Sequence, residues 1–240
     1  MKKLVVITGA SSGFGKAMAK KLHKEGYPLL LIARRLDKLK ELNLEGAICA
    51  QVDVRDYGSF KHAIRQAEQK FGVTDLLINN AGCMLLGNLE DQSRDEWQQM
   101  LDINVIGTMN GMQIVEENMK KNYHGSIINF SSIAGVKAFQ NHAAYCASKY
   151  AVVGLSEVAR QELAPFNIRV MRICPGAVNT ELLSHTTSDQ IKEDYYEWVK
   201  STGVGSITVE DIANTVFFAY KMPQGVNLRE IQIADTKQDQ

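Results

Sequence analysis

Three side chains in the middle of the sequence have the types and spacing needed for proton exchange with an alcohol or a carbonyl group. Tyr145 and Lys149 are four residues apart, so a helix places both on one face. Ser132 stands thirteen residues before the tyrosine. A free phenol is a poor base at neutral pH, because its pKa is about 10. A nearby ammonium favours tyrosinate, so the spacing predicts a tyrosine of lowered pKa that acts near pH 7.

The beginning of the chain predicts a turn that can hold a dinucleotide. An apolar run over residues 2–7 predicts a short buried strand, and residues 14–25 predict an amphipathic helix. Between them lies the pattern G-x-x-x-G-x-G, at Gly9, Gly13 and Gly15. Glycine lets the backbone come close to a pyrophosphate, and a helix N-terminus offers it free N–H groups. Taken alone, the same pattern would also suit an ordinary tight connection between a strand and a helix.

The elements that must position these residues follow from the hydrophobic pattern. Short runs rich in Val, Ile and Leu predict seven strands, near residues 2–7, 28–33, 46–52, 75–79, 125–131, 168–173 and 229–233. Amphipathic stretches predict helices near residues 14–25, 36–42, 57–71, 93–121, 145–163 and 208–221. This alternation predicts an α/β fold with a Rossmann-like, doubly wound, seven-stranded parallel sheet. We expect residues 1–240 to form a single domain.

One segment departs from the alternation. Residues 181–206 show no strand pattern and carry three aromatic residues, Tyr195, Tyr196 and Trp198. We interpret the segment as a candidate lid over the substrate. The alternative is a surface excursion that is packed by its own aromatic side chains.

Composition argues against several other classes of protein. The formal net charge of the 240 residues is zero, so nothing indicates a nucleic acid or an anionic membrane as partner. No apolar run approaches the length of a transmembrane helix, and the first one is too short for a secretion signal. The four cysteines, at positions 49, 83, 146 and 174, lack metal-ligand spacing. We therefore predict no metal site, and buried free thiols in a cytoplasmic protein.

Seven motifs along the chain resemble those of the classical short-chain dehydrogenases/reductases (SDRs), in order and at the family's spacing. They are Thr8 through Gly15, Asp53-Val54, Asn79-Asn80-Ala81-Gly82, Asn104-Val105-Ile106-Gly107, Ser132, Tyr145 with Lys149, and Pro175-Gly176-Ala177-Val178-Asn179-Thr180. The resemblance covers nearly the whole chain. Phe14 departs from it, because the family usually has an aliphatic residue there. We expect only the backbone of Phe14 to matter to a cofactor.

The resemblance implies a role for each residue of a catalytic set. Tyr145 is the general acid/base, and Lys149 lowers its pKa and holds the nicotinamide ribose. Ser132 bonds the substrate oxygen, and Asn104 maintains a water-linked proton path to Lys149. From the residues alone, Ser131 could be the functional hydroxyl in place of Ser132. Asn104 could instead satisfy buried backbone groups at a helix kink.

The resemblance also implies a set of residues that contact the cofactor. In addition to Tyr145 and Lys149, they are Gly9, Ser11, Ser12, Gly13, Phe14, Gly15, Asp53, Val54, Asn80, Ala81, Gly82, Pro175, Gly176, Val178 and Thr180. Asp53 and Val54 would flank the adenine, and Val178 and Thr180 would contact the carboxamide. A simpler role is open to Asp53, which could cap a helix, although Asp56 competes for that position.

The end of the second predicted strand indicates which cofactor is preferred. In dinucleotide folds an acidic residue there binds the ribose 2′-hydroxyl, and a basic residue accepts a 2′-phosphate. This chain has Ala33 where an NAD-preferring relative carries Asp, and Arg34 and Arg35 follow. A guanidinium fork matches phosphate geometry, and the Ser12 hydroxyl can assist it. We therefore predict NADP rather than NAD. The alternative is a solvated basic strand end.

The substrate is predicted by a narrower resemblance. The tail from Thr208 to Ile233 and the Gly-Phe-Gly of the turn resemble the bacterial NADP-dependent 3-hydroxy acid (serine-type) dehydrogenases. This implies a small hydroxy or carbonyl substrate, a 3-hydroxy acid. Residues 181–206 contain no arginine to hold a carboxylate, so that role would fall to one of four residues, Lys137, His185, Lys192 or Lys200.

Two other functions remain open. One is the reduction of 3-oxoacyl thioesters or other carbonyls, and the other is a non-catalytic NADP(H)-binding regulator. A binder needs no proton donor, so the complete set of catalytic residues argues against the regulator. The family resemblance further implies a homotetramer, formed through helices near residues 104–121 and 145–163.

Overall fold

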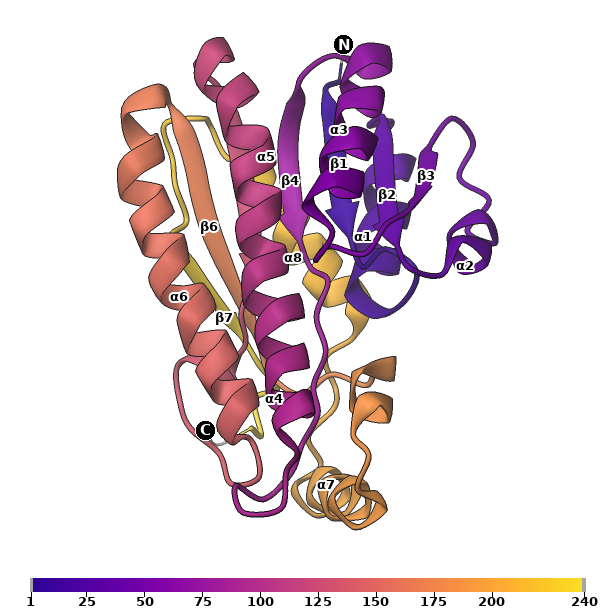
Figure 1. Ribbon diagram of the computed structural model, residues 1–240, viewed down its shortest axis with the longest axis vertical. Coiled ribbons are helices and arrows are strands. Elements are labelled where there is room, and N and C mark those ends of the chain that lie inside the picture. The colour runs from indigo at the N-terminus through magenta and orange to yellow at the C-terminus, as the bar shows by residue number, and fades with distance from the viewer. Residues whose placement is uncertain (1, 239–240) are drawn as a thin grey trace.

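Seven apolar runs of the chain form one parallel sheet in the computed structural model, which describes residues 2–238 (Figure 1). The strands are β1 (Leu4–Thr8), β2 (Leu29–Ala33), β3 (Ile48–Gln51), β4 (Thr74–Asn79), β5 (Gly125–Phe130), β6 (Ile168–Pro175) and β7 (Glu230–Ile233). Their order in the sheet is β3-β2-β1-β4-β5-β6-β7. The predicted doubly wound α/β fold is confirmed, and each strand begins and ends within two residues of its expected bounds.

Helices cover both faces of the sheet and enclose two hydrophobic cores (Figure 1). The helices of one face are α3 (Tyr57–Phe71), α5 (Gly107–Asn122) and α6 (Ala143–Leu163), and those of the other are α1 (Gly13–Lys24) and α8 (Val209–Lys221). Successive strand residues point to opposite faces. Val6 therefore packs in the core under α3 and α5, and its neighbour Ile7 packs in the core under α1 and α8. The short α2 (Leu36–Lys40) follows β2.

The topology creates a crevice at the carboxyl ends of β1 and β4. β1 pairs with β2 on one side and with β4 on the other, so the chain leaves neighbouring strands in opposite directions there. The Thr8 hydroxyl, at the end of β1, accepts hydrogen bonds from the backbone N–H groups of Asn80 and Ala81, both at 3.0 Å. The Asn80 side chain donates to the Thr8 carbonyl at 2.9 Å. These bonds fix the two loops that border the crevice.

The prediction of one continuous helix over residues 93–121 is wrong in one respect. The segment is divided into α4 (Arg94–Leu101), a π-helical turn (Asp102–Ile106) and α5. Within the π turn, the Asn104 side chain accepts from the Cys83 N–H at 2.9 Å and donates to the Cys83 carbonyl at 3.0 Å. The widened turn thus lets one side chain bind the loop after β4. The apolar spacing predicts a helix here but does not register the extra residue in the turn.

The segment over residues 181–206 is more ordered than the sequence indicated. It contains a 3₁₀ turn (Glu181–His185) and a helix, α7 (Asp189–Thr202), which Figure 1 shows away from the helices that flank the sheet. The Ser188 hydroxyl caps α7 by accepting from the Ile191 N–H, and Gly203, at φ +65°, ends it. Most residues of α7 are exposed, and only Ile191 is buried, so the segment lacks the long apolar face of the helices that pack on the sheet.

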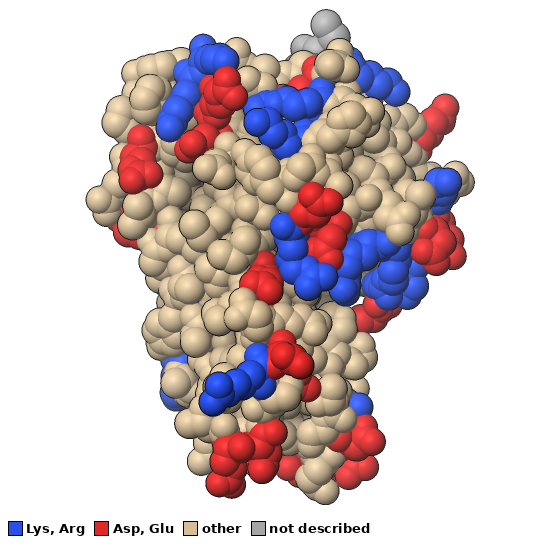
Figure 2. Space-filling model, viewed as in Figure 1, with Lys and Arg blue, Asp and Glu red and all other residues tan. Residues whose placement is uncertain are grey.

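The surface carries charges of both signs, and the middle of the face formed by α5 and α6 has few of them (Figure 2). Exposed apolar side chains on α4, the π turn, α5 and α6 include Leu101, Ile106, Met109, Tyr150 and Val158. On α5, Met112, Val115 and Met119 are buried in the core, whereas Met109 is exposed. Homotetramer formation through this face stays a prediction.

None of the helices described is both long and apolar enough to cross a membrane.

Candidate active site

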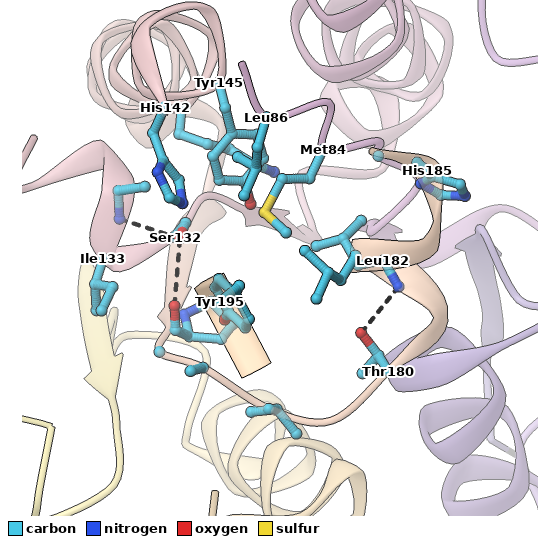
Figure 3. Close-up of a pocket in the computed structure, with 18 of the residues that line it drawn as sticks. Met84, Leu86, Ser132, Ile133, His142, Tyr145, Thr180, Leu182, His185 and Tyr195 are labelled. Atoms are coloured by element: carbon cyan, nitrogen blue, oxygen red, sulfur yellow. Dashed lines mark hydrogen bonds between the residues drawn. The ribbon is translucent and has the colours of Figure 1, made fainter. Parts of the chain in front are cut away.

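A cavity of about 680 Å³ lies at the carboxyl end of the sheet, lined by the loops after β1, β4, β5 and β6 and by α7 (Figure 3). It brings together most of the predicted site residues: Gly9, Ser12, Gly13, Phe14, Asn80, Ala81, Gly82, Ser132, Tyr145, Lys149, Pro175, Gly176, Val178 and Thr180. Seven others do not line it: Ser11, Gly15, Arg34, Arg35, Asp53, Val54 and Asn104. Of these, Gly15 and Asn104 are buried beside the cavity, and the arginines follow the end of β2.

Tyr145 is buried at the cavity wall, 5% exposed, and Figure 3 shows its side chain near that of Ser132. Burial raises the pKa of Tyr145, and the Ser132 hydroxyl partly opposes the rise. The pKa of Tyr145 is therefore not lowered by Lys149 as we expected. The Lys149 ammonium lies 5.7 Å from the centre of the tyrosine ring and donates to the Phe130 carbonyl at 3.0 Å. At neutral pH the phenol thus holds its proton.

Lys149 itself is 6% exposed. Burial lowers its pKa to about 8, because the surrounding protein solvates an ammonium less well than water does. A Cβ atom on Gly82 would lie 3.7 Å from the Lys149 nitrogen and 3.2 Å from the Asn104 amide oxygen. The bare backbone at Gly82 therefore lets both side chains come close to the loop. Asn104 also performs the simpler role considered above, since its amide satisfies the backbone of Cys83.

The two candidate serines have different partners. The Ser131 hydroxyl donates to the Lys149 carbonyl at 2.9 Å, so it holds helix α6 against the end of β5. The Ser132 hydroxyl caps a short turn by accepting from the Ala134 N–H at 3.1 Å, and it lies 3.4 Å from the Pro175 carbonyl. The Ser132 hydroxyl therefore donates a longer, weaker hydrogen bond than the Ser131 hydroxyl does, and it lies beside Tyr145.

The glycine-rich turn adopts a conformation that larger residues resist. Gly9 and Gly13 have φ angles of +66° and +48°. A Cβ on Gly9 would lie 2.8 Å from the Asn80 side chain, and one on Gly15 would lie 2.2 Å from the Gly9 carbonyl oxygen. Because α1 begins at Gly13, its first N–H groups have no partner within the helix. The turn is therefore a narrow backbone cradle with free donors.

The carboxyl ends of β2 and β3 hold the charged residues. Asp53 is bound by Arg55, whose guanidinium donates at 2.7 Å and 3.1 Å to one carboxylate oxygen, and these bonds hold the pKa of Asp53 below its usual range. Asp56, and not Asp53, caps α3 by accepting from the Ser59 N–H at 3.1 Å. The competition between the two aspartates over the helix cap is thereby resolved.

Arg35 extends to the glycine-rich turn. Its guanidinium donates to the Ser12 hydroxyl at 3.2 Å and to the Ser11 hydroxyl at 3.4 Å. It also pairs with Glu181 at 2.9 Å, and Lys38 pairs with the same carboxylate at 3.3 Å. Lys38 was missed from the sequence, although its position three residues after Arg35 on α2 could have indicated it.

Residues 3–191 match the family model for short chain dehydrogenases. The chain belongs to the short-chain dehydrogenase family. An uncharacterized oxidoreductase of Listeria monocytogenes is 39% identical over 244 residues, which cover 98% of this chain and 97% of that one. A serine dehydrogenase in its closed form, complexed with NADP⁺, is 28% identical, with a TM-score of 0.90 over 99% of this chain and 96% of that one. ElxO with NADP bound is also 28% identical, with a TM-score of 0.86 over 97% of each chain.

As a family member, this short-chain dehydrogenase is an oxidoreductase, and the outer part of its cavity is mainly apolar. The side chains there include Met84, Leu86, Phe139, Leu182, Ile191, Tyr195 and Trp198. The Tyr195 and Trp198 rings, 5.5 Å apart, contribute to this wall, so these two aromatic residues of α7 face the cavity. Among the described lining residues, Lys149 is the one lysine or arginine, and Asp194 is the one acid.

Two histidines complete the cavity wall of this short-chain dehydrogenase. The Nδ1 atom of His142 contacts the Gln140 carbonyl, so it must carry the proton, which leaves Nε2 as an acceptor. Burial lowers the pKa of His142, and burial together with Arg34 and Arg35 lowers that of His185. Both rings are therefore neutral at pH 7. Three of the four residues proposed to hold a carboxylate, Lys137, Lys192 and Lys200, do not line the cavity.

The C-terminal end of the segment over residues 181–206 is held by Asp235, which follows β7. The Asp235 carboxylate, 4% exposed, accepts from the N–H groups of Gly205 at 2.9 Å, Ser206 at 2.6 Å and Lys237 at 2.9 Å. These hydrogen bonds lower the pKa of Asp235, and the bond from Ser206 contributes most. Gln238 accepts from the Ala177 N–H at 2.9 Å and also lines the cavity. The segment over residues 181–206 therefore has one attachment near Glu181 and another at Asp235.

Proposed function

We propose that this protein transfers hydride reversibly between NADP(H) and the carbonyl or hydroxyl carbon of a small molecule with an apolar body. The observation that supports this most directly is one continuous cavity. It joins the Tyr145 and Ser132 hydroxyls to the glycine-rich turn at one end and to an apolar wall at the other. A proton donor, a cradle for a dinucleotide and a substrate compartment thus share one space.

The residues fit the dinucleotide that the fold family implies. The backbone N–H groups in the first turn of α1, which begins at Gly13, would hold the pyrophosphate. Arg35, with Ser11 and Ser12, would hold the 2′-phosphate. Asp53 and Val54 would flank the adenine, and the remaining predicted contacts line the cavity: Asn80, Ala81, Gly82, Pro175, Gly176, Val178 and Thr180. When bound, NADPH supplies the hydride that reduces a carbonyl carbon, and NADP⁺ accepts it in reverse.

The protein's own groups manage the substrate oxygen and its proton. In reduction, the Tyr145 hydroxyl gives its proton to the carbonyl oxygen, and the Ser132 hydroxyl holds that oxygen by a hydrogen bond. The raised pKa of Tyr145 suits this role, because a proton donor must hold its proton at neutral pH. The ammonium of Lys149 favours the tyrosinate that remains. Asn104 lies near enough to Lys149, across Gly82, to support the path along which that proton is replaced.

The apolar wall favours the carbonyl-reductase alternative over a 3-hydroxy acid. A buried carboxylate needs a cationic or hydrogen-bonding partner. Of the four residues predicted for that role only His185 lines the cavity, and its lowered pKa keeps it neutral. The 3-hydroxy acid stays a second candidate, and the likeness to a serine dehydrogenase structure favours it.

A matched pair of substrates tests this choice. Ethyl 3-oxobutanoate and 3-oxobutanoate carry the same ketone and differ in the charge at the far end. Within a wider panel of ketones and aldehydes, followed by NADPH absorbance, we expect the ester to have at least a tenfold higher kcat/KM. A preference for the acid would support the 3-hydroxy acid instead. If NADPH binds but no carbonyl of the panel is reduced, the regulator alternative replaces the proposed function.

Cofactor preference has its own test. Charge-assisted contacts contribute about 1.5–3 kcal/mol each, so we expect NADPH to bind roughly ten- to a hundredfold tighter than NADH. Arg35→Ala should remove most of that preference, because Arg35 extends to the turn. Arg34→Ala is the matched comparison and should have the smaller effect. Equal dissociation constants for the two cofactors in the unaltered protein would contradict the assignment.

A further inference from the structure

The Glu181 carboxylate binds the side chains that a 2′-phosphate would need. It accepts from the Arg35 guanidinium at 2.9 Å and from the Lys38 ammonium at 3.3 Å. The same guanidinium nitrogen of Arg35 bonds the Ser12 hydroxyl at 3.2 Å. Arg35 lowers the pKa of Glu181 most, and Lys38 lowers it further, so the Glu181 carboxyl group is an anion at neutral pH. An internal anion therefore already holds the donors of the proposed phosphate site.

We propose that Glu181 is a specificity-determining residue that exchanges with the 2′-phosphate of NADP(H) for Arg35 and Lys38, and that this exchange releases the start of the lid. The proposal rests on the proposed function, because it requires NADP(H) as the cofactor. It also assigns Lys38 to the phosphate site. A cofactor without the 2′-phosphate would leave Glu181 in place.

The exchange favours the phosphate for electrostatic reasons. A phosphate monoester carries a charge of up to about −2 and three strong acceptor oxygens, whereas Glu181 brings one charge and two oxygens. Two anions cannot share Arg35 and Lys38 without repelling each other. The ion pairs of Glu181 are also weak competitors, because its side chain is 49% exposed and those of Arg35 and Lys38 are 44% and 37% exposed.

Position along the chain connects the exchange to the lid. Glu181 is the first residue of the 3₁₀ turn that leads to α7. The residue before it, Thr180, lies against the glycine-rich turn, where a Cβ on Gly13 would be 3.5 Å from its side chain. Five residues after Glu181, the Thr186 hydroxyl accepts a hydrogen bond from the Leu86 N–H at 3.1 Å. Between these anchors, the Glu181 ion pairs connect the turn to Arg35, which precedes α2, and to Lys38 on α2.

Binding measurements test the exchange directly. Glu181→Gln keeps the shape of the side chain and removes the competing charge, so we expect NADPH to bind about two- to fivefold tighter, the scale of one or two exposed ion pairs. The dissociation constant of NADH should change less. Glu193→Gln is the matched control, because it removes a charge from an exposed position on α7. Lys38→Gln should weaken NADPH binding and spare NADH binding. Unchanged or weaker NADPH binding by Glu181→Gln would overturn the proposal.

Fluorescence tests the release of the lid. The chain has two tryptophans, and Trp97→Phe leaves Trp198 on α7 as the single reporter. In that background, adenosine 2′,5′-bisphosphate should change Trp198 emission, and adenosine 5′-monophosphate at the same fractional saturation should not. Adding Glu181→Gln should produce the changed emission before any ligand is added. Equal responses to the two nucleotides, or a response that Glu181→Gln leaves intact, would refute the coupling.

The two hypotheses fail in distinguishable ways. If the proposed function is wrong, NADPH does not bind, or no carbonyl of the panel is reduced. If only the exchange is wrong, NADPH binds and turnover is normal, but the ratio of NADPH to NADH affinity is the same with and without Glu181→Gln.

Discussion

The charge buried at Lys149 has a measurable cost in stability. Burial moves its pKa from 10.5 to about 8. The two values differ by about 2.5, and each pKa unit corresponds to about 1.4 kcal/mol, so the charged form costs the cofactor-free native state about 3 kcal/mol. The cost is present in full below pH 8, where the native lysine is charged. It fades between pH 8 and 10.5, where the native lysine loses its proton before the unfolded one does.

Lys149→Met removes this charge while keeping an unbranched side chain of similar length. The variant also loses the hydrogen bond to the Phe130 carbonyl, and leaving that buried acceptor unpaired costs about 1–3 kcal/mol. Because that loss does not depend on pH, the change with pH identifies the charge. We expect the free energy of unfolding of Lys149→Met, relative to the unaltered protein, to fall by about 2 kcal/mol from pH 7 to pH 9.5.

Urea unfolding of both proteins at pH 7, 8, 9 and 9.5 measures this difference, at one protein concentration and without cofactor. Burial also raises the pKa values of Cys83 and Cys174 to about 11, so both proteins lose stability above pH 9. Both contain these thiols, so their contribution largely cancels in the comparison. A difference that stays constant within about 0.5 kcal/mol across this range would refute the reasoning that Lys149 is held charged at an energetic cost. Carbonyl reduction should be lost in Lys149→Met at every pH.

Three further predictions concern the catalytic set, the lid and the assembly. Tyr145→Phe should keep NADPH binding and lower turnover by about 10² or more, the scale of lost general acid/base catalysis, measured by NADPH absorbance; near-normal turnover would contradict the mechanism. Ser132→Ala should lower turnover strongly, and Ser131→Ala, the control, should act more mildly in the same assay. Asp235→Asn should speed proteolytic cleavage at residues 203–206 and raise KM for the carbonyl with little change in NADPH affinity; unaltered cleavage would argue against the attachment. Light scattering should give the mass of a homotetramer at micromolar concentration, and a monomer mass would reject it.

The sheet was predictable because each of its strands depends on a local signal. Residues such as Val5, Val6 and Ile7 form runs that are apolar on both faces, as a strand covered by helices requires. The alternation of strands and helices then predicted a doubly wound parallel sheet, and the structure supplies the order of its strands. The candidate catalytic pair could be proposed for the same reason, since the spacing from Tyr145 to Lys149 is itself a local pattern.

Features that depend on contacts between distant residues were not predictable. A helix kink at Asn104 was one of the alternatives that the residues left open, but its bonding partner, Cys83, lies twenty-one residues earlier in the chain and was not predictable. The raised pKa of Tyr145 depends on burial that the complete fold creates. Glu181 meets Arg35 and Lys38 from across the molecule, and neither its own neighbours nor theirs indicate it. Such pairings depend on tertiary placement, which local propensity does not encode.

The π turn makes this region sensitive to the length of the chain as well as to its composition. A π turn accommodates one residue more than a regular α-helical turn, so deleting one residue from Asp102–Ile106 would let α4 and α5 join as one regular helix with nearly the same relative orientation. α5 is fixed against β4, where a Cβ on Gly111 would lie 2.3 Å from the Asn79 side chain. The change would therefore fall on Asn104, whose side chain would lose its bonds to the Cys83 backbone. We expect such a deletion to give a folded protein with a continuous helix and no activity, whereas most substitutions in the same five residues leave that geometry intact.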